Sequence, residues 1–539
     1  MALAAEARAR LDMPADPVGA IPREYNFAAD VLQRNLAAGR TNKPAFIDPR
    51  GSWSYAQLAD RVDRFGAVLR SLGIRREERI LICLLDTIDW PTAFLGAIKA
   101  GVVAVPVNTL MTENDYRFML ADSRARVVVV SEALYPKFAK LIPECPDIAH
   151  VIVSGDDAQG HKRFEDLIAD AKPEPFTAPT LRDDMCFWLY TSGSTGKPKG
   201  AVHIHADLPL THDLYAGPIL GLTENDVCYS VAKLFFAYGL GNALTFPMSV
   251  GATTVLLPDR PTPDSVAALL KKHAVTVFYA VPTFYAAFLS SAALPQRSEL
   301  KLRRCVSAGE ALPEDVGRRW LDRIGVDILD GIGSTEMLHI FISNRPGDVK
   351  YGTTGKPVPG YSAKLVGDDG LPVRKGEMGE LWISGPTSAV MYWNNREQSR
   401  RTFLGEWTRS GDKYLEDKDG YYVYCGRNDD MLRVSGQYVS PFEVEAALQT
   451  HAAVLECAVV AWHDADGLVK PKAFVVLKAP DGVADAKARD QLSRGLQEHV
   501  KSRLAPFKYP RWIEFRQELP KTATGKIQRF KLRAEGPSR

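Results

Sequence analysis

The chain has 539 residues, too many for one ordinary hydrophobic core, and a prior of about 150 residues per domain predicts three or four structural units. Its 67 basic and 65 acidic residues leave a net charge of +2, which excludes a strong electrostatic attraction of the whole molecule to nucleic acid or to an acidic membrane. The balance of charge favours a small-molecule substrate. Seven dispersed cysteines without a CxxC pair, no signal-peptide pattern and no apolar run of about 18 residues lead us to expect a cytoplasmic protein, neither secreted nor membrane-spanning.

Up to about residue 180, helical patterns alternate with short apolar runs. Runs at 79–85, 102–107 and 126–130 are typical of parallel strands buried on both faces, and a helical pattern covers 90–100. The same alternation returns between residues 252 and 306. We therefore predict an α/β fold with two layered α/β halves that extend to about residue 350.

The segment from Tyr190 to Gly200, at the junction of these halves, packs three glycines, four serine and threonine side chains and two lysines into eleven residues. Glycines let backbone N–H groups approach phosphate oxygens closely, and hydroxyl and ammonium groups add donors and positive charge. A kinase-type or ATPase-type P-loop is excluded, because Pro198 follows Lys197 and the upstream glycine is absent. We interpret the segment as a phosphate-binding loop of another kind, with contacts from Thr191, Ser192, Gly193, Ser194, Thr195, Gly196, Lys197 and Lys199.

From about residue 351 the pattern changes to short strands separated by turns, such as 379–384, which predicts a smaller β-rich subdomain. A final stretch of about 110 residues follows, with a helical pattern at 441–449 and a strand at 473–477. We predict a large N-terminal domain, 1–428, and a small α+β C-terminal domain, 429–539, that can move as a body.

Five further motifs follow the phosphate loop in order. They lie at 307–311 (Ser-Ala-Gly-Glu-Ala), 330–336 (Asp-Gly-Ile-Gly-Ser-Thr-Glu), 410–412 (Ser-Gly-Asp), 426–436 and 520–526 (Pro-Lys-Thr-Ala-Thr-Gly-Lys). Together they resemble the adenylate-forming superfamily of acyl-CoA ligases, luciferases and peptide-synthetase adenylation domains, over roughly residues 25–530. The resemblance implies that ATP activates a carboxylate as an acyl-adenylate with release of diphosphate, and that a thiol then accepts the acyl group.

The same resemblance assigns the nucleotide contacts. It places the ribose hydroxyls on Asp412, with Arg427 as a partner, and the α-phosphate near Thr335. It makes Glu336 a Mg²⁺ ligand through bound water. Thr191 is the second candidate ligand of the ion. Mg²⁺ suits a lone carboxylate next to phosphate oxygens because it keeps most of its waters. Adenine is expected between Ala308, Gly309 and Glu310 on one side and Asp330, Gly331, Ile332 and Gly333 on the other.

The resemblance also implies two arrangements for two half-reactions. Lys526 is the implied catalytic lysine, because its ammonium could reach both the carboxylate and the α-phosphate during adenylation. The C-terminal domain is expected to rotate about a hinge at Asp429. That rotation removes the lysine and brings Ser435 and Gly436 to the tunnel for coenzyme A, the thiol co-substrate.

The acyl pocket implied by the resemblance has aromatic walls with a small residue among them, which suit a flat apolar ring. An α-amino acid is disfavoured, because no acidic residue is present to meet an amino group. Segments 25–39, 235–242 and 337–344 are similar to those of benzoate–CoA ligases, which implies an AMP-forming acid–thiol ligase that initiates aromatic acid degradation. The candidate pocket residues are Phe236, Ala237, Tyr238, Gly333, His339 and Ile340.

Several alternatives stay open at this point. The protein could be a short- or medium-chain fatty acyl-CoA ligase, or an adenylation enzyme that loads an aryl group onto a carrier protein. A nonenzymatic nucleotide-binding protein is disfavoured by the joint presence of Lys526, Glu336 and the phosphate loop. His203 and His205 are spaced like a metal pair but lack a supporting Cys, His or Asp cluster. The tolerated ring substituents and a homodimeric state are left open.

Overall fold

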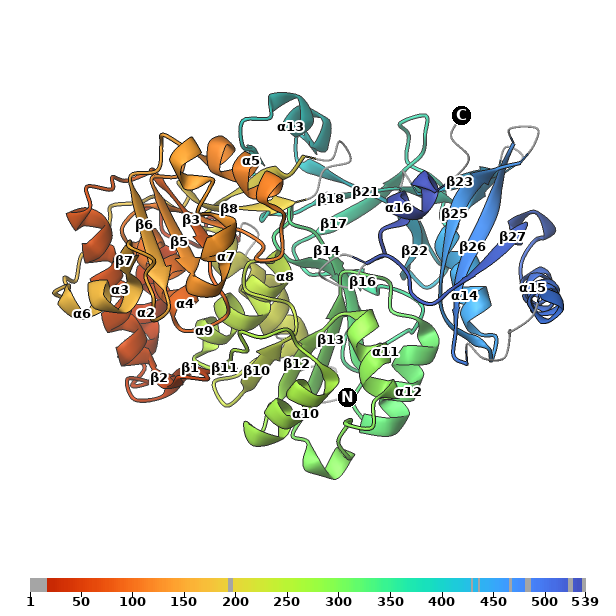
Figure 1. Ribbon diagram of the computed structural model, residues 1–539, viewed down its shortest axis with the longest axis horizontal. Coiled ribbons are helices and arrows are strands. Elements are labelled where there is room, and N and C mark those ends of the chain that lie inside the picture. The colour runs from red at the N-terminus through yellow and green to blue at the C-terminus, as the bar shows by residue number, and fades with distance from the viewer. Residues whose placement is uncertain are drawn as a thin grey trace. The chain divides into compact units, whose positions relative to one another are not determined.

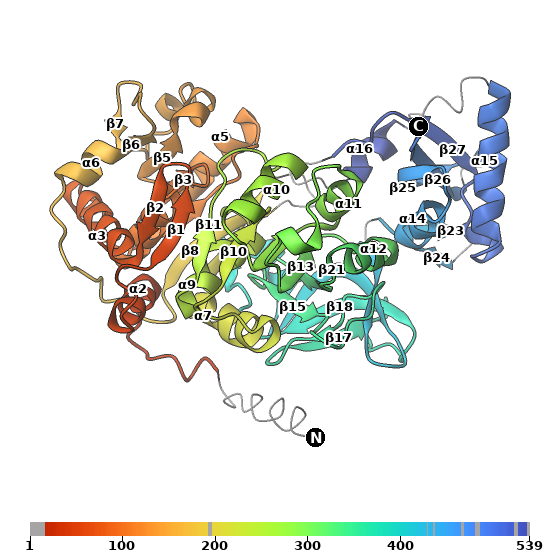
Figure 2. The same cartoon turned by 90° about the horizontal axis from the view of Figure 1, so that it is seen from below.

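The computed structural model describes residues 17–191, 197–427, 430–434, 437–464, 468–479, 486–521 and 527–535. Contacts within the chain define two compact units, whose helices and strands are labelled in Figure 1 and Figure 2. Unit 1 consists of Met1–Ala363 and Ile383–Arg409, and unit 2 of Lys364–Trp382 and Ser410–Arg539. No helix within the described ranges is both long and apolar enough to cross a membrane. All seven cysteines are buried free thiols, as expected of small core residues.

The first sheet of unit 1 has eight strands in the order β19-β9-β8-β4-β3-β5-β6-β7. The neighbours from β8 to β7 run parallel, as the apolar runs predict, whereas β9 is antiparallel to both β8 and β19. The strands are β3 (Arg79–Cys83), β4 (Val103–Pro106), β5 (Val127–Ser131), β6 (His150–Ser154), β7 (Lys162–Arg163), β8 (Met185–Thr191), β9 (Lys199–Ile204) and β19 (Met391–Tyr392).

Alternate residues of these strands face two different cores. Ile80 and Ile82 of β3 belong to the core that contains helices α2 (Phe27–Ala37), α3 (Tyr55–Ser71) and α4 (Asp89–Lys99). Leu81 and Cys83 belong to the core beneath α5 (Glu113–Ser123). Because helices cover both faces, both sets of residues are apolar and the strands read as continuous apolar runs.

The second sheet of unit 1 has nine strands in the order β16-β15-β14-β13-β12-β10-β11-β1-β2. Its members are β1 (Pro44–Asp48), β2 (Gly51–Ser54), β10 (Val227–Ser230), β11 (Thr253–Val255), β12 (Val277–Ala280), β13 (Arg304–Ala308), β14 (Ile328–Gly333), β15 (Ile340–Ser343) and β16 (Lys356–Pro357). The two predicted α/β layers are confirmed, but they are not consecutive in sequence. The early hairpin β1–β2 joins the second sheet, where Phe46 lies opposite Thr254 in parallel pairing and covers the edge of β11.

Helices α10 (Pro263–Lys272), α11 (Pro282–Ser290) and α12 (Glu314–Ile324) lie along one face of the second sheet (Figure 1). Trp320 of α12 packs against Phe278 of β12 and Tyr285 of α11, with ring centroids 6.3 and 4.8 Å apart. The remaining helical segments of unit 1 are α6 (Phe164–Asp170), α7 (Asp207–Thr211), α8 (Ala237–Leu240), α9 (Phe246–Val250), α13 (Arg396–Thr402), the π-helical η3 (His212–Leu220) and η4 (Gly241–Thr245), and the 3₁₀ turns η1 (Glu132–Lys137), η2 (Ile142–Glu144) and η5 (Arg297–Glu299).

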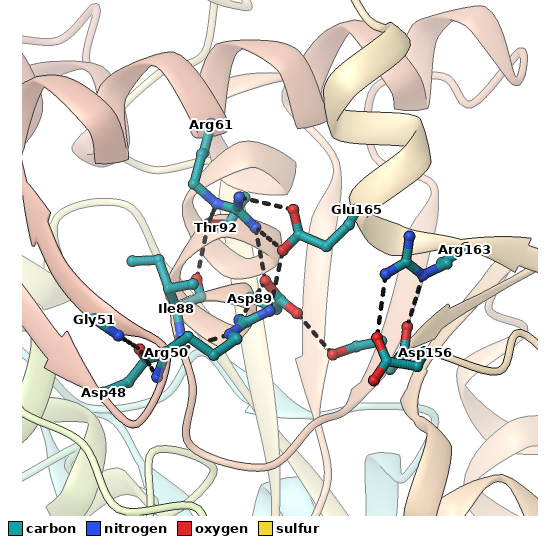
Figure 3. Close-up of polar contacts among 12 residues, drawn as sticks. Asp48, Arg50, Gly51, Arg61, Ile88, Asp89, Thr92, Asp156, Arg163 and Glu165 are labelled. Atoms are coloured by element: carbon teal, nitrogen blue, oxygen red, sulfur yellow. Dashed lines mark hydrogen bonds and ion pairs between the residues drawn. The ribbon is translucent and has the colours of Figure 1, made fainter.

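A network of charged side chains ties the β1–β2 hairpin to α3, α4 and α6 (Figure 3). Arg61 of α3 donates to Asp89 (2.7 Å) and to Glu165 of α6 (2.8 Å), and Arg50 of the hairpin pairs with both carboxylates at 2.8 and 3.0 Å. Burial raises the pKa of Asp89, and the two guanidinium groups oppose that rise. A buried charge without a partner is costly. These ion pairs therefore fix the position of the β1–β2 hairpin relative to α3, α4 and α6.

A five-stranded sheet forms in the region where short strands are predicted, with the order β17-β18-β21-β20 and with β22 paired to β21. Its strands are β17 (Ser362–Val366), β18 (Met378–Ser384), β20 (Phe403–Leu404), β21 (Trp407–Glu416) and β22 (Tyr422–Arg427). The contact-based units group 410–427 with the C-terminal residues, whereas the sequence places the domain boundary after residue 428. That boundary stays a prediction.

Unit 2 also contains the three-stranded sheet β25-β26-β27, in which β25 and β26 are antiparallel and β26 and β27 parallel. Val444 and Leu496 pack on one face of it, and Leu532 packs on the other. Glu445 and Arg529 form a buried ion pair with contacts of 2.7 to 3.2 Å. The elements are β23 (Leu432–Val434), β24 (Gln437–Val439), α14 (Pro441–Gln449), β25 (Val454–His463), β26 (Val469–Leu477), α15 (Ala486–Lys501), η7 (Pro506–Lys508), β27 (Trp512–Arg516) and α16 (Arg529–Ala534).

Candidate active site

The predicted phosphate loop joins two neighbouring antiparallel strands of unit 1. Thr191, the last residue of β8, lies opposite Lys199, the first residue of β9. The Nζ of Lys197 lies 5.9 Å from the centroid of the Phe118 ring. The residues from Ser192 to Gly196 lie outside the described ranges. The described ends of the loop are thus held by strand pairing on both sides.

Glu336 is linked to this hairpin through Tyr392 of β19, a residue that the sequence analysis does not single out. The Tyr392 hydroxyl donates to Glu336 Oε1 (2.6 Å) and accepts from Lys199 Nζ (3.2 Å). The backbone carbonyl of Glu336 accepts from the Ala389 N–H at 2.7 Å. The structure therefore brings together the candidate metal ligand and one lysine of the candidate phosphate loop.

A buried histidine holds the neighbouring residue, Thr335. His203 of β9 is fully buried, with Nε2 2.8 Å from the Thr335 carbonyl oxygen and Nδ1 2.8 Å from Asp207 Oδ2. Because a carbonyl oxygen only accepts, Nε2 carries a hydrogen and donates it. Burial raises the pKa of Asp207, and the hydrogen bond to His203 lowers it. His203 thus fixes the backbone of the turn between β14 and β15 that carries Glu336.

The two segments predicted to hold adenine lie side by side. Strands β13 and β14 pair in parallel, with Ala308 opposite Gly331. Gly309 follows β13 directly and has a φ of 94°, a conformation that favours glycine, and Glu310 comes next. The Asp330 side chain is buried, and burial raises the pKa of its carboxyl well above the usual range. A nucleotide contact at this position would therefore come from the backbone of 331–333.

An aromatic cluster around His339 forms part of the predicted acyl pocket. The His339 ring centroid lies 5.5 Å from that of Tyr238, 4.5 Å from Phe246 and 5.5 Å from Tyr215. Tyr215 of η3 and Phe246 of α9 are absent from the sequence-based pocket, because no motif marks either segment. Of the six predicted pocket residues, Gly333 lies opposite Ile340 in the β14–β15 pair, and Phe236 and Ala237 directly precede Tyr238 at the start of α8.

The ring of His339 is uncharged near neutral pH, because burial lowers its pKa to about 3. Its Nε2 lies 3.3 Å from the Tyr238 carbonyl oxygen and 3.2 Å from Asn242 Oδ1. Two acceptors at Nε2 place the ring hydrogen there. Nδ1 has no hydrogen-bond partner within the described part of the chain. His339 thus contributes a flat ring without a net charge to the aromatic cluster.

Glycines permit close packing around this ring. A Cβ at Gly333 would lie 2.5 Å from the His339 carbonyl oxygen, and one at Gly241 would lie 2.4 Å from His339 Cδ2. A Cβ at Gly239 would lie 1.9 Å from the Lys233 carbonyl oxygen. Gly239 and Gly241 therefore permit close packing of the backbone around Lys233 and of the His339 ring.

In unit 2, the two residues predicted to contact the ribose face each other. Asp412 of β21 lies opposite Arg427 of β22, and Arg427 Nε is 3.7 Å from Asp412 Oδ1. The Arg427 side chain is 51% exposed, so this ion pair contributes at most about 1 kcal/mol and can exchange partners at low cost. Lys526, Asp429, Ser435 and Gly436 lie outside the described residues.

The chain matches the AMP-binding enzyme family over residues 32–393 and the AMP-binding enzyme C-terminal domain over 443–526. It therefore belongs to the AMP-binding enzyme family. The benzoate–CoA ligase of Thauera aromatica is 59% identical over 96% of this chain and 97% of its own length. The 4-hydroxybenzoate–CoA/benzoate–CoA ligase of Rhodopseudomonas palustris is 49% identical over 95% and 94%.

Two solved structures are similar along nearly their whole length. A benzoate CoA ligase from Burkholderia xenovorans has a TM-score of 0.88 and 54% identity, and the match covers 94% of this chain and 100% of that one. An anthranilate CoA ligase in complex with anthranoyl-AMP has a TM-score of 0.90 and 44% identity, and the match covers 96% of this chain and 98% of that one.

The burial of His205, which directly follows β9, predicts that the protein loses stability in acid. This histidine is 1% exposed, its Nδ1 accepts from the Phe27 N–H, and burial lowers its pKa to about 4, against about 6.5 in the unfolded chain. The unfolded state binds more protons between these values, so the free energy of unfolding falls as pH falls, by up to about 3 kcal/mol from this group.

A His205→Asn variant keeps an acceptor for Phe27 and removes the titration. Urea denaturation should give similar unfolding free energies for the variant and the parent protein at pH 8, and a smaller loss for the variant at pH 4.5. Equal losses in both proteins would contradict a histidine that is buried in its neutral form.

Proposed function

We propose that this protein joins benzoate, or a closely related small aromatic carboxylate, to coenzyme A in an ATP-dependent reaction with an acyl-adenylate intermediate. AMP and diphosphate are the other products. The observation that carries this proposal is the neutral aromatic cluster of Tyr238 and His339, placed beside the β14–β15 strand end in a chain 59% identical to a benzoate–CoA ligase. Buried free thiols suit a cytoplasmic location for the enzyme.

The first half-reaction joins two anions. A carboxylate oxygen attacks the α-phosphorus of ATP, and the bond from that phosphorus to the diphosphate oxygen breaks. Lys197, Lys199 and the backbone of the loop that begins at Thr191 would hold the β- and γ-phosphates. Thr335, whose backbone His203 holds, would face the α-phosphate. Lys526 is proposed to stabilise the charge that develops between the carboxylate and this phosphate.

A Mg²⁺ ion fits the residues around Glu336. Mg²⁺ prefers one or two carboxylates together with phosphate oxygens and water, and the half-buried Glu336 carboxylate is linked through Tyr392 to the lysine of the phosphate loop. Glu336 would hold the ion, and Thr191 is the second candidate contact. When bound, the ion supplies positive charge against the phosphates.

The second half-reaction transfers the acyl group. The sulfur of coenzyme A attacks the acyl carbonyl carbon, the bond from that carbon to the AMP oxygen breaks, and the thiol proton is released. Ser435 and Gly436 are the proposed coenzyme A contacts, and Asp429 is the proposed hinge between the two arrangements. Asp412 and Arg427 would bind the ribose by exchanging their mutual contact for its hydroxyls.

An assay of AMP release tests the proposal against its rivals. With ATP, Mg²⁺ and coenzyme A, we expect benzoate to support fast AMP formation, and hexanoate to support little, because a flexible chain fills a flat aromatic pocket poorly. Fast AMP formation with hexanoate alone would instead indicate a fatty acyl-CoA ligase. Adenylation that coenzyme A cannot discharge would indicate loading of a carrier protein. 4-Hydroxybenzoate, run in parallel, reports on ring substituents.

A Gly241→Ala variant tests the pocket itself. The new Cβ would lie 2.4 Å from His339 Cδ2, so the ring must shift from its position in the aromatic cluster. We expect the KM for benzoate to rise by about tenfold or more, equivalent to a loss of about 1–3 kcal/mol, while the KM for ATP changes little.

Gly217→Ala is the matched control, since its Cβ would meet no atom closer than 3.5 Å. An equal KM for benzoate in the Gly241→Ala variant and in this control would show that His339 does not line the acyl pocket.

A further inference from the structure

Tyr392 is held rigidly at the edge of the eight-stranded sheet. It is 2% exposed and lies opposite Ala201 in the antiparallel β9–β19 pair. Its backbone N–H donates to Ser399 Oγ at 2.9 Å, and its ring packs against Phe403 with centroids 5.2 Å apart. The position of the hydroxyl is therefore fixed by the backbone, by α13 and by a neighbouring ring.

The hydroxyl of Tyr392 joins two groups of opposite charge. It donates to Glu336 Oε1 at 2.6 Å, a distance typical of a charge-assisted hydrogen bond to a carboxylate. At the same time it accepts from Lys199 Nζ at 3.2 Å, and that ammonium also lies 4.3 Å from the Tyr392 ring centroid. A phenol can donate one hydrogen bond and accept another, so both contacts hold together.

Glu336 needs such a contact because of where it lies. It is half-buried in the turn between β14 and β15, and a carboxylate in a turn has several accessible side-chain rotamers. Its backbone is already fixed, since its carbonyl accepts from Ala389, three residues before Tyr392 in the chain. Ala389, just before β19, thus holds the backbone of Glu336, and Tyr392 of β19 holds its side chain.

We propose that Tyr392 is a positioning residue that orients the Glu336 carboxylate for Mg²⁺–ATP and couples it to Lys199 of the phosphate loop. The inference rests on the proposed function of the site. Tyr392 contacts neither the reacting carboxylate nor the proposed acyl pocket, and it acts through Glu336. Groups that orient a metal ligand by a hydrogen bond typically change metal affinity or activity by about 10–100-fold when removed.

Tyr392→Phe removes the hydroxyl and keeps the ring that packs on Phe403. The direct readout is the binding of a non-hydrolysable ATP analogue, measured by calorimetry over a range of Mg²⁺ concentrations without any carboxylic acid or coenzyme A. We expect Mg²⁺-dependent binding to weaken about 10–100-fold. In turnover, adenylation should need correspondingly more Mg²⁺, with an unchanged KM for benzoate.

Tyr361→Phe is the matched control. Tyr361 is also buried, at 7% exposed, and its hydroxyl shares a 2.7 Å hydrogen bond with Thr387 Oγ1, but it has no contact with Glu336 among the hydrogen bonds of the described residues. We expect its Mg²⁺-dependent binding to equal that of the parent protein. Binding lost to the same extent in both variants, or kept in both, would overturn the inference.

A double-mutant cycle separates positioning from general damage to the fold. If Tyr392 acts through Glu336, then Tyr392→Phe costs little further affinity in a Glu336→Gln background. Equal costs with and without Glu336 would refute the coupling. The parent protein's benzoate-dependent AMP formation is scored separately, so failure of the proposed function and failure of this inference give different results.

Discussion

The hydrogen bonds from Lys199 to Tyr392 and from Tyr392 to Glu336 join three segments that are far apart in sequence. Each segment is fixed for its own reason: Lys199 and Tyr392 lie in paired strands, and Glu336 lies in a turn whose neighbour Thr335 accepts from His203. Adenylation requires opposite charges to be arranged before ATP arrives, because rearranging them during the reaction would add to the barrier. The edge of the eight-stranded sheet supplies that arrangement in advance.

The aromatic cluster around His339 obeys a different constraint, which is the absence of charge. A protonated imidazole would be costly in the buried cluster of Tyr238, Tyr215 and Phe246, and burial accordingly keeps His339 neutral. Gly333 and Gly241 leave room for this ring, since a Cβ at either position would collide with His339. Charged groups therefore gather around Glu336, while uncharged rings surround His339.

Local patterns in the sequence predict much of this fold, because covered parallel strands such as 79–83 and 127–131 must be apolar on both faces. The two segments that the resemblance assigns to adenine lie side by side, with Ala308 opposite Gly331, and their contact with adenine stays a prediction. The insertion of the 44–54 hairpin into the second sheet, and the contact of Tyr392 with Glu336, could not be predicted. Both depend on contacts between residues that are far apart in sequence. Hydrophobic periodicity and motif spacing do not report such contacts.

The protein activates a carboxylate as an acyl-adenylate before any thiol takes part. Exchange of labelled diphosphate into ATP is the measurement to make for this order of steps, because reversal of adenylation needs the acid but not coenzyme A. We expect rapid benzoate-dependent exchange with Mg²⁺ and without coenzyme A. Exchange that is absent, or that appears only when coenzyme A is added, would contradict it.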